Sequence, residues 1–189
     1  MKDITEINLV GKELMSVKTK QKVDTIINSF LVVIGLLIII LAALKYSNVK
    51  TIFLIVMFSY AILNILQFIL TKDSKDYEGL YTFLASLVVG IIDLFFSFDS
   101  ANVLAISLMA WVTIMAVIKF IKTDYYNDRK DKMWKLRIIL LILFIIIGIV
   151  TSISLNYSDN VRVMILGYFF LIHGILELID PITKYLIGK

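Results

Sequence analysis

Residues 137–150 read Arg-Ile-Ile-Leu-Leu-Ile-Leu-Phe-Ile-Ile-Ile-Gly-Ile-Val, an almost unbroken apolar run after its first residue. A strand of a membrane barrel would instead alternate apolar and polar residues over about 10 positions. The β-branched residues favour a strand in water, but in lipid the backbone N–H and C=O groups of a segment have to be satisfied internally, and a helix does this. The run therefore predicts a transmembrane helix.

The rest of the chain has the same character. Its residues are 60% apolar and the mean hydropathy is +0.92, which is more apolar surface than one soluble core of 189 residues can bury. A bilayer is spanned by about 20 apolar residues. Six stretches approach that length: Thr25–Leu44, Thr51–Leu70, Leu80–Phe96, Ala101–Ile121, Leu136–Leu155 and Val161–Ile179. The sequence predicts an all-α polytopic membrane protein in which too little chain remains for a separate soluble domain.

The first span is interpreted as a permanent anchor. Its apolar run is longer than the ~7–15 residues of a secretory signal, and no cleavage site of small residues precedes Lys45. The chain contains no cysteine, so disulfides and thiolate metal sites are excluded.

The basic residues predict the orientation of the helices. Fifteen of the 19 Lys and Arg residues fall in the two ends of the chain and in the second and fourth loops, three fall on the other side, and Lys119 lies within a helix. Cytoplasmic loops retain positive charge, so both termini are predicted to be cytoplasmic in a cell (inner or plasma) membrane. This distribution also accounts for the net charge of +4 without nucleic acid as a partner.

Three segments at or beyond the ends of the predicted spans carry predictions of their own. In residues 1–24, apolar residues recur every three or four positions among charges, which suits either a helix on the cytoplasmic surface or a disordered tail. The loop 122–137 is basic and predicts contact with anionic lipid. Residues 180–189 are predicted to form a cytoplasmic tail.

The spans form three similar hairpins, 25–70, 80–121 and 136–179. The first helix of each carries a glycine at the same place, namely Gly35, Gly90 and Gly148. Repetition at a fixed period indicates duplication of one unit, and units of two crossings enter the membrane from the same side. We therefore predict a pseudo-threefold bundle, with Gly35, Gly90, Gly148, Gly167 and Gly174 as close helix contacts. A homo-oligomer is compatible with the sequence.

The third hairpin carries Gly167 and Gly174 in Ile-Leu-Gly-Tyr-Phe-Phe-Leu-Ile-His-Gly (165–174). With six helices and a repeated hairpin over residues 25–179, this resembles the HdeD-like acid-resistance membrane proteins, a short-repeat family. Met57 and Asn64 in the first hairpin, and Met109 and Ala116 in the second, replace the two glycines. The resemblance implies an inner-membrane protein linked to acid or general stress tolerance.

Asp93 is the first candidate among the polar residues at membrane depth, where ionisable side chains are costly and call for a functional explanation. Its predicted position is past the middle of the third span, toward the outer side. One interpretation is that it takes up a proton when the outside acidifies. The other is that it fixes helix packing, with the hydroxyls of Thr151, Ser152 or Ser107, or the amide of Asn102, as partners.

Lys119, His173 and Glu177 form the second group of candidates. Lys119 and Glu177 occupy equivalent repeat positions, so at matched depth they could pair, whereas snorkelling of Lys119 to headgroups is the alternative. His173 and Glu177 are four residues apart on one helix face. A buried structural histidine and a proton relay are both open for His173.

No enzyme signature is present: the sequence lacks a phosphate-binding loop, a nucleophile elbow and a zinc-binding helix motif, and its single histidine forms no metal site alone. We therefore expect a non-enzymatic protein without cofactor or metal. The alternative is a small proton-coupled transporter or channel that uses Asp93 and the Lys119/Glu177 group.

Overall fold

The computed structural model describes residues 2–46, 48–72, 77–95, 101–128, 133–155 and 157–187, with side chains described from residue 19 onward except at 101, 125, 126 and 187. Within these residues the structure consists of α-helices and has no strand, which confirms the all-α prediction. The helices are α1 (Lys2–Ala43), α2 (Val49–Thr71), α3 (Glu78–Phe95), α4 (Ala101–Asp128), α5 (Trp134–Ser154) and α6 (Asp159–Ile187). All six are long and apolar enough to cross a membrane.

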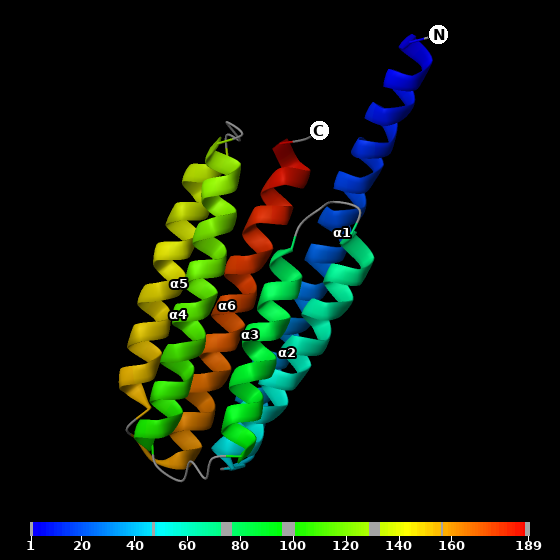
Figure 1. Cartoon of the computed structure of the whole chain (residues 1–189). Helices are drawn as coiled ribbons and strands as arrows, with labels where there is room; N and C mark the ends of the chain where they lie inside the picture. Colours follow the sequence, from blue (N-terminus) through cyan, green and yellow to red (C-terminus); the bar gives the residue numbers. More distant parts are fainter. Residues whose placement is uncertain are drawn as a thin grey trace.

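The six helices run up and down in chain order, so both termini lie at one end of the bundle (Figure 1). We call this the terminal end; the α2–α3 and α4–α5 connections also lie there. The α1–α2, α3–α4 and α5–α6 connections lie at the opposite end. Asn48 directly precedes α2. Its side chain accepts a hydrogen bond from the Thr51 N–H and so caps this helix.

The helices form a closed ring in which close and loose contacts alternate. The closest pairs are α1 with α6, α2 with α3, and α4 with α5, whereas the two helices of one hairpin pack less extensively. The close contacts therefore join successive hairpins, and α6 returns to α1 to complete the ring, as pseudo-threefold symmetry requires. The symmetry is imperfect because α6 also contacts α2 across the ring.

The repeated glycines lie at the contacts between hairpins. A Cβ added to Gly90 would meet Met57 and Phe58 of α2, and one added to Gly148 would meet Val112 of α4. The tightest contact is between α1 and α6, where a Cβ on Gly35 would overlap the backbone of Leu171. Gly167 and Gly174 face α1 in return. Small residues allow this backbone approach, which stabilises helix pairs in lipid.

Gly79 is a further contact glycine that the sequence did not indicate. An added Cβ there would lie 2.9 Å from the carbonyl oxygen of Asn64 on α2. The sequence placed Gly79 in a loop, one residue before the predicted third span, whereas α3 begins at Glu78.

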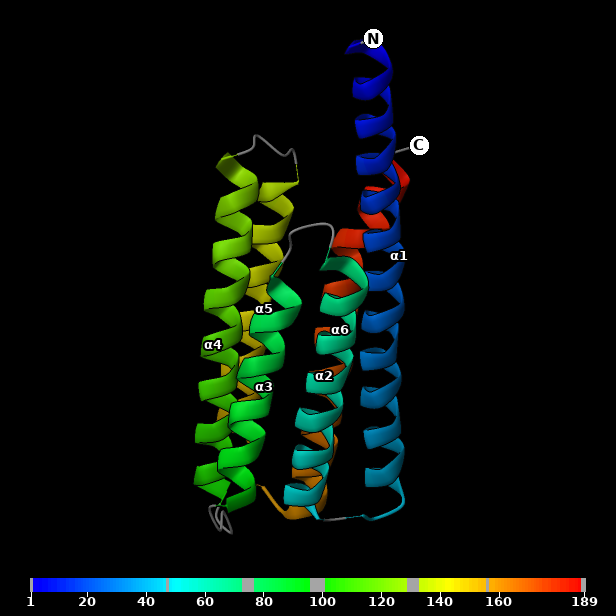
Figure 2. The ribbon, with the colours of Figure 1, turned by 45° about the vertical axis from the view of Figure 1, so that its right-hand side comes forward.

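The helices at the terminal end extend beyond the predicted spans. α1 is one continuous helix from Lys2 whose first turns project past the rest of the bundle (Figure 2), so residues 2–24 continue into the first span without a break. Nothing in Lys-Gln-Lys-Val-Asp (20–24) breaks a helix. The predicted loop 122–137 is also largely helical, because α4 continues to Asp128 and α5 begins at Trp134; residues 129–132 lie outside the described part.

The segment predicted as a tail, 180–189, is helical as far as the structure describes it. α6 continues through Pro181 to Ile187, so this proline lies inside a helix and not after it. Proline removes one backbone hydrogen bond from a helix, and the structure replaces that bond from another helix, as described below.

Aromatic side chains fill the middle of the ring. Trp111 is fully buried, and the rings of Phe144, Phe169 and Phe170 lie with centroids 6.1–6.2 Å from its own. The Trp111 Nε1–H donates to the Ser86 hydroxyl over 2.9 Å. Large apolar side chains elsewhere remain exposed on every helix, as expected for a surface solvated by lipid.

Candidate functional site

Charged and amide side chains gather at the terminal end of the ring, and each hairpin contributes one bridge between its own two helices. In the first hairpin the Gln67 Nε2 donates to Asp24 Oδ1 over 2.6 Å. In the second, the Lys122 ammonium pairs with the Glu78 carboxylate. In the third, the Arg137 Nε donates to Asp180 Oδ1 over 3.1 Å. The pseudo-threefold order of the helices thus extends to their polar side chains.

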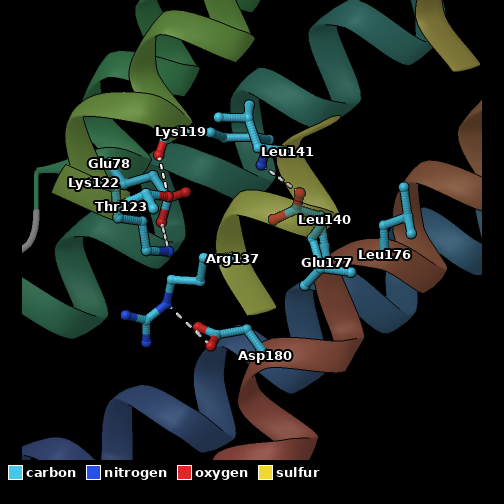
Figure 3. A pocket seen from close by; sticks show the side chains of 10 residues that line it. All are labelled: Glu78, Lys119, Lys122, Thr123, Arg137, Leu140, Leu141, Leu176, Glu177 and Asp180. Atoms are coloured by element: carbon cyan, nitrogen blue, oxygen red, sulfur yellow. Dashed lines mark hydrogen bonds and ion pairs between the residues drawn. The ribbon is translucent and has the colours of Figure 1, made fainter. Parts of the chain in front are cut away.

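Glu177 connects the three hairpins to one another. Its carboxylate pairs with the Lys119 ammonium, which joins α6 to α4 (Figure 3). Its backbone carbonyl accepts a hydrogen bond of 3.0 Å from the Asn28 amide nitrogen on α1. One residue of the third hairpin is therefore held by the first and by the second.

We call this set of side chains the terminal network: Asp24, Asn28, Gln67, Glu78, Lys119, Lys122, Arg137, Glu177 and Asp180, with Lys184 lying 3.7 Å from Asp180. Among these residues four carboxylates face three lysines and one arginine, and the Lys20 ammonium beside Asp24 adds a further positive charge. Opposite charges paired within a bundle reduce the desolvation penalty that each would carry alone.

The bond from Asn28 has a specific cause in the sequence of α6. In a regular helix the Glu177 carbonyl would accept from the N–H of residue 181, but Pro181 has none. The Asn28 side chain supplies the missing donor from α1. Neighbouring helices commonly satisfy carbonyls freed by proline in transmembrane segments.

This arrangement makes a double-mutant prediction. Asn28→Leu should lower stability in detergent by about 1 kcal/mol because a carbonyl loses its donor. In a Pro181→Ala background, where the substituted residue supplies its own N–H, the same change should cost much less. Thermal unfolding of the four proteins measures the coupling. Equal effects of Asn28→Leu in both backgrounds would contradict the assignment of Asn28 to the proline-freed carbonyl.

His173 is fully buried between the terminal network and the aromatic layer. Its Nε2 lies 3.4 Å from the Tyr60 hydroxyl, and its Nδ1 lies 3.8 Å from Glu177 Oε1. The ring also packs against Phe144, with centroids 4.7 Å apart, and against Trp111 at 5.6 Å. His173 therefore contacts Glu177, as its spacing of four residues suggested, and also Tyr60, which the sequence did not indicate.

Asp93 lies apart from this group, two residues before the last residue of α3 at the opposite end of the bundle. It is 3% exposed, and its Oδ1 accepts from the Ser107 hydroxyl on α4 over 2.6 Å. Of the partners considered from the sequence, Ser107 is thus the one that contacts it. The Ser152 hydroxyl donates instead to the Gly148 carbonyl on its own helix.

The structure brings Lys119, His173 and Glu177 together and leaves Asp93 separate. Sequence reasoning missed several members of the terminal network because it assigned their charges to loops or to a tail. Asp24, Glu78, Lys122, Arg137 and Asp180 all lie within helices, and Arg137 is only 5% exposed. A usable signal was present: each charge lies within about one turn of a predicted span end, and opposite charges occur on both helices of the second and third hairpins.

Among the residues that the structure describes, no three His, Cys, Asp or Glu side chains are grouped so that they could hold a metal ion. The network is chemically suited to holding helix ends together and to exchanging protons or water.

Two regions of the chain, residues 84–153 and 139–185, match the family described as short repeat of unknown function (DUF308). Together they cover more than half of the sequence. The chain belongs to the DUF308 family. No curated protein and no solved structure matches it.

The two DUF308 matches overlap on α5. The first runs from α3 to the end of α5, and the second from α5 through most of α6, so both lie in the second and third hairpins. HdeD belongs to the same family, and the resemblance stated above is confirmed at that level. With six membrane-spanning helices, this DUF308 chain is a multi-pass membrane protein.

Proposed function

We propose that the chain is a non-enzymatic protein of the HdeD-like kind in the cell (inner or plasma) membrane. Both termini lie in the cytoplasm, and its role is in acid or general stress tolerance. It acts through the membrane or through assembly with other proteins, not through turnover of a substrate. The orientation is supported by the charge distribution, because the basic loops and both termini share the terminal end.

The observation that carries the proposal is that the helices are tied together at the terminal end and that aromatic side chains fill the middle of the bundle. The terminal network ties the helices together at one end, with all three hairpins meeting at Glu177. Beyond it, Trp111 and its aromatic neighbours fill the middle. The single histidine is fully buried and packs against these rings.

A small proton-coupled transporter or channel is the second candidate, and one observation favours it. Glu177, His173 and Tyr60 form a chain of contacts that reaches from the terminal network toward the middle of the bundle. The next polar pair, Ser86 with Trp111, is seven residues from Asp93 on α3, or about 10.5 Å at the rise of an α-helix. Between them α3 presents Val89 and Gly90 to the interior. This gap favours the closed, non-transporting protein.

The two candidates predict different results in two assays. Expression in an acid-sensitive bacterial host should raise survival after a shift to acid, and proteoliposomes holding the purified chain should show no flux above empty liposomes under a pH gradient. Unchanged survival would contradict the stress role. Proton flux that is lost in Asp93→Asn and Glu177→Gln would establish the transporter instead.

A further inference from the structure

A small polar cavity of about 40 Å³ lies just inside the terminal network, among α1, α2, α3, α4 and α6. Side-chain amides line it (Asn28, Asn64 and Gln67), together with the hydroxyls of Tyr60 and Thr82. Glu177 and other charged members of the network complete its wall. It is therefore a polar space that is continuous with the terminal network.

The size and lining of the cavity suit water. A cavity needs about 10–15 Å³ to hold one water molecule, which in turn needs two to four polar partners. The three amide nitrogens already donate to protein groups, namely Asn28 to the Glu177 carbonyl, Asn64 to the Tyr60 carbonyl and Gln67 to Asp24. The oxygens of the same amides are acceptors that water can supply with hydrogen bonds.

The cavity reaches His173 through two of its lining residues. The Tyr60 hydroxyl lies 3.4 Å from His173 Nε2, and Glu177 Oε1 lies 3.8 Å from Nδ1. On the other side of His173, Trp111, Phe144 and Phe169 pack against the ring and separate it from the opposite end. Both ring nitrogens thus face groups of the cavity wall, whereas the route to the opposite end is aromatic.

We propose that this cavity is a water-filled vestibule on the terminal side of the bundle, and that His173 exchanges its ring proton with water through it. Protons reach His173 from the side of the basic loops and not from the opposite side. Hydration of the cavity and proton access to His173 are separate properties from the role in stress proposed above, and they do not depend on it.

Water-edited solid-state NMR of the full chain in lipid bilayers tests the hydration. Magnetisation from water should reach the Tyr60 ring and the Asn64 side chain sooner than Met57, one turn from Tyr60 toward the opposite end of α2. The three residues are comparably buried, at 4%, 4% and 0% exposure, so a dry interior predicts equal rates. A transfer to Tyr60 that is as slow as the transfer to Met57 would overturn the proposal.

The Asn64→Leu variant tests proton access. Leucine removes one amide and fills part of the cavity, so the variant should show slower water transfer to Tyr60 and a longer lifetime of the His173 ring N–H. Thr113→Leu, an exposed position on α4, is the control for a general effect of substitution and should change neither signal. If Tyr60 loses its water while the His173 N–H lifetime is unchanged, the assigned route to His173 is wrong.

Discussion

Gly35→Ala should lower stability by about 3 kcal/mol, the upper part of the range for an overpacked interior. The added methyl group would overlap the Leu171 nitrogen and lie 2.6 Å from its Cα, and neither backbone atom can move aside alone. α1 and α6 would have to separate along the closest contact in the ring. Thermal unfolding in detergent measures the loss.

Gly90→Ala is the matched control because Gly90 is the equivalent position in the second hairpin. Its nearest neighbours would be side-chain atoms of Met57 and Phe58 at 3.4 Å, which is ordinary van der Waals contact. The change should therefore alter stability by less than about 0.5 kcal/mol. Similar losses for the two variants would show that the backbone contact at Gly35 is not what distinguishes these sites.

Lys119→Met should cost about 3 kcal/mol because it leaves the Glu177 carboxylate without its ammonium partner inside the helix bundle. Both side chains are largely but not fully buried, at 11% and 20% exposure, and removing one partner of such an ion pair is more destabilising than replacing both. The double variant Lys119→Met/Glu177→Leu should therefore recover much of the loss. Unfolding by heat or by a denaturing detergent gives the three free-energy differences.

Lys22→Met is the control for Lys119→Met. It removes the same charge from the same end of the bundle, but from an exposed side chain on α1, so its effect should stay within about 0.5 kcal/mol. If Lys22→Met and Lys119→Met are equally destabilising, the loss reflects the overall charge of the terminal end and not the pair with Glu177.

The sequence was sufficient for the fold because hydropathy and repetition are local signals. Nearly continuous apolar runs defined six helices, and the glycines at 35, 90 and 148 defined three equivalent hairpins. The ends of the helices were less well predicted. Arg137 was counted as the end of a loop and Asp180 as the start of a tail, whereas each lies within a helix and the two side chains pair.

The site was predictable only where depth alone brings residues together. Lys119 and Glu177 occupy equivalent positions in their repeats, so the sequence predicted that they lie at the same depth in the membrane. The structure shows the two side chains in contact. Tyr60 beside His173 depends on how α2 packs against α6, which no spacing along the chain reveals. The Asn28 bond was not predictable, because the last span was ended at Ile179 and Pro181, placed after it, would then free no helix carbonyl.

The contact between α1 and α6 also sets an order of events during synthesis. α2 can pair with α3, and α4 with α5, as each helix enters the membrane after its neighbour. The glycine face of α1 has no close partner until α6 has been inserted. Closing the ring is therefore the last step, and α1 remains a loosely held helix while the middle of the chain is already assembled. If synthesis stopped before α6, the bundle would stay open, and α1 would be the helix most accessible to a membrane protease.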